Sequence, residues 1–171
     1  TEQYEYRDLT SIYPLMILFK KGDELKKYLI KKAVEGISIG FVHTMGALHE
    51  GHLSLIRAAK EKNGLVVSSI FVNPTQFNDQ QDYLHYPKTI DQDILLLEKS
   101  ACDVLFLPDV QEIYPSGYLP DHYALGSLET VLEGKYRPGH FQGVCQVVDR
   151  LLAIVMPSTL FLGQKDYQQC M

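Results

Sequence analysis

The sequence predicts an α/β fold, a doubly wound and mostly parallel β-sheet with helices on both of its faces. Short apolar runs alternate along the chain with stretches of helical periodicity, and such an alternation leads to right-handed crossovers between parallel strands. Several of these runs are apolar at consecutive positions, as in strands covered on both faces. A chain of 171 residues suits one domain, which we expect over residues 15–171, behind a polar lead-in over residues 1–14.

Five short apolar runs are the expected strands. The longest contains serines and is far too short to cross a bilayer, so no membrane span is expected. The runs cover residues 15–19, 37–42, 65–72, 104–107 and 160–162.

Four stretches between these runs have the periodicity of amphipathic helices, at residues 23–35, 50–62, 89–100 and 140–156. The last has the clearest pattern, and Pro157 follows it, as expected at a helix end. Its apolar positions are Phe141, Val144, Cys145, Val148, Leu151, Leu152 and Val155, and its polar positions are Gln142, Gln146, Asp149 and Arg150. The preceding stretch, Tyr114 to His140, is rich in Gly, Pro and Tyr, and we expect it to be a long surface excursion.

Composition argues against several classes of function. The formal net charge is −5 and no basic run occurs, which disfavours nucleic-acid and membrane-surface partners. Cys102, Cys145 and Cys170 are odd in number and widely spaced, a pattern typical of a reducing cytoplasm and not of a disulfide framework. The first residues lack the basic start and cleavage site of a signal peptide. We therefore expect a cytoplasmic protein.

A segment rich in histidine and glycine, HTMGALHEGHLSL over residues 43–55, joins a predicted strand to a predicted helix. Ligands of parallel sheets bind at the carboxyl ends of strands, and phosphates bind at helix N-termini. His49 and His52 lie on one face of the first helical turn, and Gly51 leaves room for a ligand to approach the backbone. Imidazoles donating to phosphate oxygens, beside free helix N–H groups, would stabilise charge that develops during transfer at phosphorus.

Other interpretations of this segment stay open. The sequence has neither G-x-x-x-x-G-K-[ST] nor G-x-G-x-x-G, so the common nucleotide-binding motifs are absent. His49 and His52 can be half-buried residues of a helix start that bind nothing. Together with His43 they can bind zinc, although no matching cysteine or carboxylate set lies nearby in the sequence. Gly46 and Gly51 can be ordinary turn residues.

Five blocks in a fixed order carry a family resemblance. They are TMGALHEGHLSLI (44–56), SSIFVNPTQF (68–77), YP (86–87), EGKYRPGHFQGV (133–144) and FLGQKDYQQ (161–169). In this order they resemble the pantothenate synthetase (pantoate–β-alanine ligase) family of the H-x-G-H nucleotidyltransferase superfamily, from about Leu15 to the last residue. Any one block is weak, and the order makes the resemblance specific. It implies a Rossmann-like domain.

The resemblance implies an ATP-dependent ligase that joins pantoate to β-alanine in two steps. The pantoate carboxylate attacks the α-phosphorus of ATP, giving pantoyl adenylate and pyrophosphate, and the β-alanine amine then attacks the acyl carbon and releases AMP. The resemblance also implies Mg2+ on the ATP phosphates and a homodimer. Adenylation needs opposed charges held in line, which a lysine and imidazoles can provide.

The resemblance also assigns catalytic and ATP-contacting residues. His52 is implied as the general acid or proton donor, with His49 and Lys165 acting beside it on the phosphates. The implied ATP-binding residues are Met45, Gly46, Ala47, Leu48, His49, Glu50, Gly51 and His52, followed by Gly163, Gln164, Lys165 and Asp166.

Substrate-binding and metal-binding residues are assigned in the same way. Gln76 is implied to hold pantoate and to border the β-alanine site, with Asn73 beside it. Gln169 is the implied second pantoate-binding glutamine, and Tyr86 is implied near pantoate and the phosphates. Glutamine amides both donate and accept, which suits a substrate with hydroxyls and a carboxylate. Asp93 is the candidate magnesium ligand.

Two features depart from the family pattern. The family usually has proline where His43 stands, and we interpret His43 as a substitution that makes the turn entry less rigid, not as a third catalytic histidine. The family also has a smaller C-terminal domain, preceded by a Ser-Ser-Arg segment that clamps the ATP phosphates. Residues 1–171 contain neither, so by themselves they are expected to bind ATP and pantoate weakly and to be inactive or nearly so.

Two alternative functions remain. Another H-x-G-H nucleotidyltransferase, acting on phosphopantetheine or nicotinamide mononucleotide, would carry an Ile-Ser-Ser/Thr-Thr-x-Arg-like block, which this sequence lacks. A non-catalytic ATP-binding or assembly domain is the second alternative. In that case Lys165 and Asp166 are a solvated pair, and the glutamines are surface residues.

Overall fold

A single parallel sheet forms the centre of the molecule. The computed structural model describes residues 15–170, so the lead-in expected over residues 1–14 lies outside the described part. Five strands occur in the order β1-β4-β3-β2-β5, and each neighbouring pair is parallel. The strands are β1 (Ile17–Phe19), β2 (Ile39–Thr44), β3 (Leu65–Ile70), β4 (Val104–Phe106) and β5 (Thr159–Leu160).

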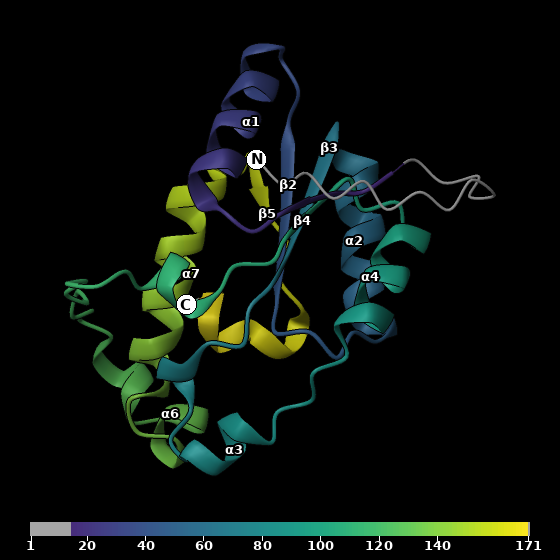
Figure 1. Ribbon diagram of the computed structural model, residues 1–171. Helices are drawn as coiled ribbons and strands as arrows, with labels where there is room; N and C mark the ends of the chain where they lie inside the picture. Colours follow the sequence, from purple (N-terminus) through teal and green to yellow (C-terminus); the bar gives the residue numbers. More distant parts are fainter. Residues whose placement is uncertain (1–14, 171) are drawn as a thin grey trace.

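Helices cover both faces of this sheet, as the sequence predicts. Figure 1 shows α1 and α7 on one side of the strands and α2 and α4 on the other. The helices are α1 (Gly22–Val34), α2 (Glu50–Lys62), α3 (Gln80–Leu84), α4 (Ile90–Lys99), α5 (Val110–Ile113), α6 (Leu132–Tyr136) and α7 (His140–Val155). Three 3-10 turns are η1 (Pro74–Gln76), η2 (Gly126–Glu129) and η3 (Gln164–Cys170). Among the described residues, no helix is long and apolar enough to cross a membrane.

The strand order explains which helix lies on which face. From β2 through β3 to β4 the chain moves in one direction along the sheet, and α2 and α4 connect these strands. From β1 to β2 and from β4 to β5 it moves the opposite way, through α1 and α7. Because crossovers between parallel strands are right-handed, a reversal of direction moves the connecting helix to the other face. The predicted doubly wound fold is confirmed.

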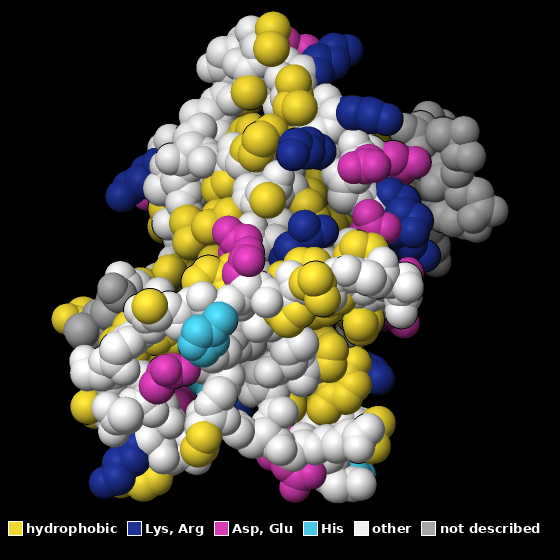
Figure 2. Space-filling model, turned by 90° about the vertical axis from the view of Figure 1, so that its left-hand side faces the viewer, with side chains coloured by type: hydrophobic (Ala, Val, Ile, Leu, Met, Phe, Trp, Pro, Cys, Tyr) yellow, Lys and Arg dark blue, Asp and Glu magenta, His cyan; other side chains and the backbone are white. Residues whose placement is uncertain are grey.

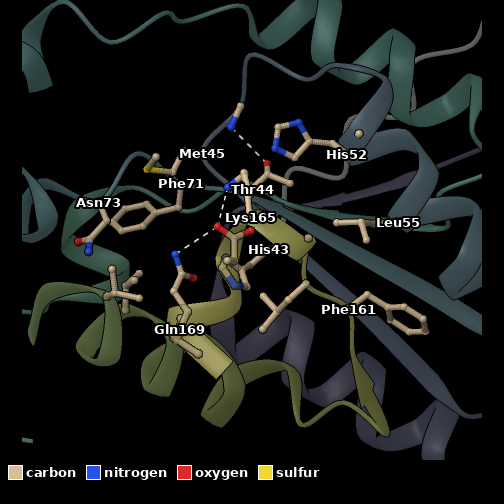
Figure 3. Close-up of a pocket in the computed structure, with 18 of the residues that line it drawn as sticks. His43, Thr44, Met45, His52, Leu55, Phe71, Asn73, Phe161, Lys165 and Gln169 are labelled. Atoms are coloured by element: carbon tan, nitrogen blue, oxygen red, sulfur yellow. Dashed lines mark hydrogen bonds and ion pairs between the residues drawn. The ribbon is translucent and has the colours of Figure 1, made fainter. Parts of the chain in front are cut away.

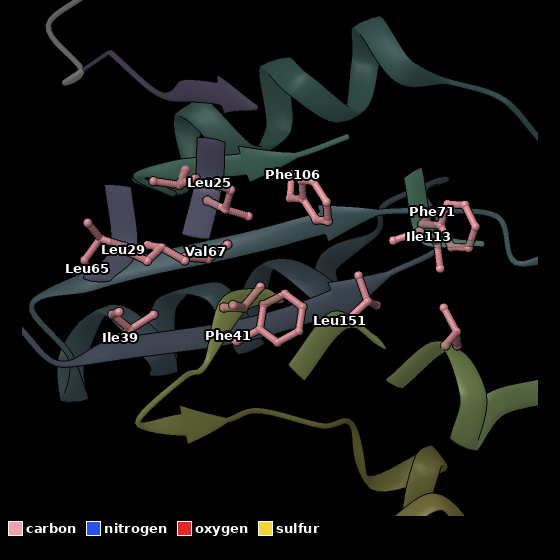
Figure 4. Packing of buried hydrophobic residues seen from close by; sticks show 13 residues of the cluster. Leu25, Leu29, Ile39, Phe41, Leu65, Val67, Phe71, Phe106, Ile113 and Leu151 are labelled. Carbon is pink, nitrogen blue, oxygen red and sulfur yellow. The ribbon is translucent and has the colours of Figure 1, made fainter. Parts of the chain in front are cut away.

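Two hydrophobic clusters, one on each face, hold the layers together. The cluster against α1 and α7 includes Phe41 of β2 and Phe106 of β4, which project from the two strands on either side of β3 (Figure 4). The cluster against α2 and α4 includes Ile56 and Leu97. All six residues of β3 are buried, which explains why this run is not alternating in the sequence.

The structure corrects several predicted boundaries and positions. β2 continues to Thr44, because His43 and Thr44 pair with Ser69 and Ile70 of β3, so His43 is a strand residue and not part of the following loop. On α7 the buried stripe includes Val147, which the predicted stripe omits. The excursion from Tyr114 to His140 is confirmed as a non-sheet segment, although it contains η2 and α6.

Candidate active site

A cavity of about 510 Å³ opens at the carboxyl ends of β2, β3 and β5, a volume within the usual range for small-ligand sites. Its walls come from the loop after β2, the η1 turn, one face of α7 and the η3 segment. In Figure 3, Lys165 lies between His52 and Gln169, with Asn73 and Met45 toward one end and Leu55 and Phe161 toward the other. The fold thus brings the blocks of residues 44–56, 68–77, 133–144 and 161–169 into one site.

Most of the predicted site residues line this cavity, and three do not. Leu48 is buried in the core cluster against α2 and α4. Glu50 is exposed and pairs with Arg57, which also lies on α2. Asp93 is buried behind the loop, with 1% of its surface exposed. Side-chain contacts from these three residues to a ligand are therefore not supported by the geometry.

The loop after β2 has an unusual backbone. Gly46 and Ala47 both have positive φ angles, 83° and 49°, and a left-handed conformation is rare for alanine. Thr44 stabilises the loop entry, because its Oγ1 accepts from the Gly46 N–H at 3.2 Å and donates to the Ser69 carbonyl at 2.8 Å. A strained loop of this kind needs further contacts to persist.

Asp93 of α4 supplies these contacts. Its Oδ2 accepts from the Ala47 N–H at 3.0 Å, and its Oδ1 accepts from the Leu48 N–H at 2.8 Å. Thr89 donates to the same Oδ2 at 3.1 Å. The family resemblance implies Asp93 as a magnesium ligand, but its oxygens accept three hydrogen bonds inside the protein. Among the described residues, no cluster of three or more His, Cys, Asp and Glu side chains is arranged to hold a metal ion, which disfavours the alternative in which His43, His49 and His52 bind zinc.

The two loop histidines form a reciprocal cap at the start of α2. His49 is the N-cap residue, and its Nδ1 accepts from the Gly51 N–H at 3.1 Å. In return, His52 Nδ1 accepts from the His49 N–H at 3.4 Å. A neutral imidazole carries one proton, so a ring that accepts at Nδ1 holds its proton at Nε2. The cap therefore fixes both rings as Nε2–H donors, with centroids 4.1 Å apart.

This arrangement corrects two details of the prediction. The N–H groups of His49 and Gly51 are not free at the helix start, because the imidazoles already accept from them. The space at Gly51 serves the protein itself, since a Cβ there would come within 2.9 Å of the His49 ring. Donors for an anion at this point are therefore chiefly the imidazole Nε2–H groups.

Electrostatics keep the half-buried His52 neutral. Burial lowers its pKa below the ordinary 6.5, and the neighbouring His49 and Lys165 lower it further. Burial likewise lowers the pKa of His43. The His43 Nε2 atom and the Oγ of its register partner Ser69 are buried without hydrogen-bond partners among the described residues.

The η1 turn carries the first predicted substrate-binding pair. Gln76 is largely buried, and its Nε2 donates to the Met45 Sδ at 2.8 Å. Asn73 lines the cavity, but its amide nitrogen donates to Gln76 Oε1 and to the Gly143 carbonyl, at 3.2 Å and 3.0 Å. Its Oδ1 accepts from Tyr114 at 2.9 Å. Asn73 thus supports the turn, while Gln76 has a weak sulfur acceptor that a ligand can replace.

α7 fixes the η1 turn from the other side. Gly143 packs against the turn so closely that a Cβ would lie 2.4 Å from the Thr75 carbonyl oxygen. His140 is 5% exposed, and its Nδ1 donates to the Gln76 carbonyl at 2.9 Å. Sequence reasoning did not assign either residue. Their only local signal is a glycine and a histidine at the start of an otherwise apolar helix.

The η3 segment carries the last predicted block. Lys165 is mostly exposed, and its Nζ lies 2.6 Å from Asp166 Oδ1. Gln169 donates to the same oxygen at 3.3 Å, so Asp166 orients both side chains. Gln168, which the sequence interpretation passed over, is buried, and its Nε2 donates to the carbonyls of Leu128 and Val131 at 3.1 Å and 3.0 Å. These two hydrogen bonds join η3 to the excursion over residues 114–140.

Tyr86 also lines the cavity. Its ring packs edge-on against Phe77, with centroids 5.7 Å apart. Burial, with a smaller contribution from the Asp93 charge, raises the pKa of its hydroxyl. The phenol therefore stays protonated and can donate a hydrogen bond into the cavity.

Comparison with known proteins identifies relatives of this arrangement. The family described as pantoate-beta-alanine ligase matches residues 17–171. Two curated relatives are the pantothenate synthetases of Aquifex aeolicus and Thermodesulfovibrio yellowstonii. The first is 50% identical, covering 90% of this chain and 54% of its own, and the second is 55% identical, covering 79% and 48%.

Solved structures similar to this chain belong to the same family. Pantothenate synthetase from Thermus thermophilus is similar with a TM-score of 0.83 at 44% identity, covering 90% of this chain and 54% of its own. Pantoate-beta-alanine ligase from Francisella tularensis, solved in complex with beta-gamma ATP and beta-alanine, has a TM-score of 0.86 at 47% identity, covering 91% and 59%. The chain spans about half the length of the relatives it matches.

Proposed function

Since this chain belongs to the pantoate-β-alanine ligase family, we propose that it takes part in the ATP-dependent ligation of pantoate and β-alanine to pantothenate through a pantoyl adenylate. One observation carries the proposal. A single cavity holds two imidazoles with fixed Nε2–H donors, a lysine and two glutamines, which are groups suited to a triphosphate and a hydroxylated carboxylate. The Francisella relative, bound to an ATP compound and beta-alanine, supports this choice of substrates.

In the first step, a carboxylate oxygen of pantoate forms a bond to the α-phosphorus, and the bond from that phosphorus to the bridging oxygen breaks. The electron pair leaves with pyrophosphate. The Nε2–H groups of His49 and His52 donate hydrogen bonds to phosphate oxygens and stabilise the charge that develops there, and both rings keep their protons. Lys165, whose side chain is mostly exposed, exchanges its Asp166 partner for phosphate oxygens, while Asp166 keeps the hydrogen bond from Gln169.

In the second step, the β-alanine amine attacks the acyl carbon and forms the amide bond. The bond from that carbon to the phosphate oxygen breaks, its electron pair leaves with AMP, and the amine proton is released to solvent. We assign pantoate to the polar end of the cavity, where Gln76 and Gln169 can each donate and accept, with Tyr86 beside them. The adenine base fits the opposite end, where Leu55 and Phe161 offer apolar surface (Figure 3). The α-phosphorus then lies between the two ends, near Lys165.

Magnesium enters this proposal as part of the ATP–magnesium substrate. Mg2+ commonly binds phosphate oxygens and keeps several waters, so it does not need a cage of protein ligands. The only chemistry we assign to it is neutralisation of phosphate charge.

A homodimer and a cytoplasmic location complete the proposal. Figure 2 shows hydrophobic side chains gathered on the α1–α7 face, and Ile30, Val34 and Met156 are large apolar residues exposed there. Such surface supports self-association, which light scattering at increasing concentration can measure. The three free cysteines support a reducing compartment.

Isotope exchange between pyrophosphate and ATP tests the activity. We expect label from pyrophosphate to enter ATP only when pantoate is present. Exchange that depends on nicotinamide mononucleotide or phosphopantetheine would favour another nucleotidyltransferase. Absence of both exchange and nucleotide binding would favour an assembly domain.

A further inference from the structure

We propose that Asp93 is a positioning residue that holds the phosphate-contacting loop in place by binding the loop's own N–H groups. Its place in the ligand site rests on the proposed function, whereas its role in the loop is independent of it. The proposal gives Asp93 a task different from that of a magnesium ligand.

The loop backbone forms a concave nest for an anion, and Asp93 occupies it from inside the protein. The left-handed pair Gly46 and Ala47 turns the N–H groups of Ala47 and Leu48 toward one point. Successive N–H groups in such conformations create an anion-binding concavity. Here the anion is the Asp93 carboxylate, at 3.0 Å and 2.8 Å from the two nitrogens. These N–H groups are therefore not available to a phosphate.

The carboxylate is itself held in position by α4. Asp93 lies one turn after Thr89, whose carbonyl accepts the Asp93 N–H at 2.8 Å and whose hydroxyl donates to Oδ2 at 3.1 Å. α4 packs against α2 and the sheet through the cluster that contains Leu97 and Ile56. The Asp93 carboxylate thus fixes the loop relative to the packed helix α4.

The conformation of the loop in turn determines where His49 and His52 lie. Leu48, which donates to Oδ1, directly precedes His49, the N-cap residue of α2 and half of the reciprocal imidazole cap. Gly46 also lies against the carboxylate, since a Cβ there would come within 3.1 Å of Oδ2. If the carboxylate is removed, the left-handed pair loses its support, and the Nε2–H groups lose their direction toward the phosphates.

The test combines two variants with a matched control. Asp93→Ala removes both acceptors, and Asp93→Asn keeps one acceptor oxygen. Asp91→Asn removes an exposed carboxylate from the same turn of α4. Hydrogen exchange by NMR reports protection of the Ala47 and Leu48 amides, and calorimetry reports ATP affinity, once with excess magnesium and once in EDTA.

We expect Asp93→Ala to abolish protection of both amides and to weaken ATP binding on the order of 10- to 100-fold, because the loss of a hydrogen bond to a charged phosphate group has an effect of this size. The fold-decrease in ATP affinity should be the same with and without magnesium. Asp93→Asn should lose protection at one amide and show a smaller loss of affinity, and Asp91→Asn should behave as wild type.

Unchanged protection of both amides in the Asp93 variants would overturn the proposal, and so would a loss of affinity that appears only with magnesium. If Asp93→Ala does not fold, Asp93→Asn and Thr89→Val decide the question by the same measurements. A wild-type protein that binds no ATP would refute the proposed function, while the exchange of the two amides would still decide the role of Asp93.

Discussion

Substitution of Gly143 by alanine tests how α7 positions the η1 turn. The added Cβ would lie 2.4 Å from the Thr75 carbonyl oxygen, 2.6 Å from the Thr75 carbonyl carbon and 2.8 Å from the Gln76 nitrogen. Ordinary contact begins at about 3.4 Å, so the turn must retreat by about 1 Å. The atoms in the way belong to backbone, so a change of rotamer cannot relieve the clash.

Two opposing effects determine the change in stability. Overpacking of this kind typically costs about 1–3 kcal/mol, and alanine regains about 1 kcal/mol over glycine in a helix. We therefore expect the free energy of unfolding to fall by about 0–2 kcal/mol. Pantoate binding should also weaken, by about 1–3 kcal/mol, since the turn carries Gln76 and its displacement leaves polar groups unpaired.

Urea unfolding measures the free energy of unfolding, and calorimetry with pantoate measures the affinity for that substrate. Ala153→Gly, at an exposed position of α7, isolates the effect of helix propensity. A Gly143→Ala protein that is about 1 kcal/mol more stable than wild type and binds pantoate normally would refute the close packing of α7 on the turn.

Four further outcomes follow from the site. His52→Ala should reduce pantoyl-adenylate formation by roughly 100- to 1000-fold without unfolding the protein, and an unaltered rate would remove His52 from the catalytic residues. Gln76→Ala should weaken pantoate binding by about 1–3 kcal/mol in calorimetry while ATP binding persists. Loss of ATP affinity with normal pantoate affinity would show that Gln76 does not bind pantoate. Because burial lowers the pKa values of His43 and His52, the unfolded chain binds more protons below about pH 6.5. The free energy of unfolding should therefore fall from about pH 7 to about pH 5, and it should fall less steeply in His52→Gln than in the wild type. An equal pH dependence in the two proteins would contradict this prediction. Residues 1–171 as a separate polypeptide should gain melting temperature with ATP–magnesium but produce pantothenate near background, and rapid synthesis would contradict the expected need for a closing domain.

The sequence was sufficient for the class of the fold because the relevant patterns are local. A strand buried on both faces, such as β3, is apolar along most of its length, and a helix such as α7 repeats its apolar residues every three or four positions. The alternation of the two kinds of segment then requires parallel strands and helices on both faces. Boundaries were less certain, because the end of β2 depends on its pairing with β3, which no local pattern records.

Part of the site was also predictable from the sequence. The spacing of His49 and His52 predicts that both rings lie on one face at the helix start. The structure places them 4.1 Å apart there, His49 as the N-cap and His52 in the first turn of α2. The ordered blocks predicted that Gln76, Lys165 and Gln169 belong to one site, and all three line one cavity. Their contacts with substrates remain predictions.

The tertiary structure alone decided how these groups are held. Asp93 accepts from amides 45 and 46 residues away, and Asn73 donates to a carbonyl 70 residues away. The imidazole tautomers depend on which nitrogen the loop backbone reaches, and the tight contact at Gly143 depends on how α7 packs on the η1 turn. Local periodicity determines which face of an element is buried, but it contains no information on which distant backbone group will meet a given polar atom. That pairing is set only when the helices pack against the sheet, because buried polar groups must then find partners among the groups that packing brings within reach.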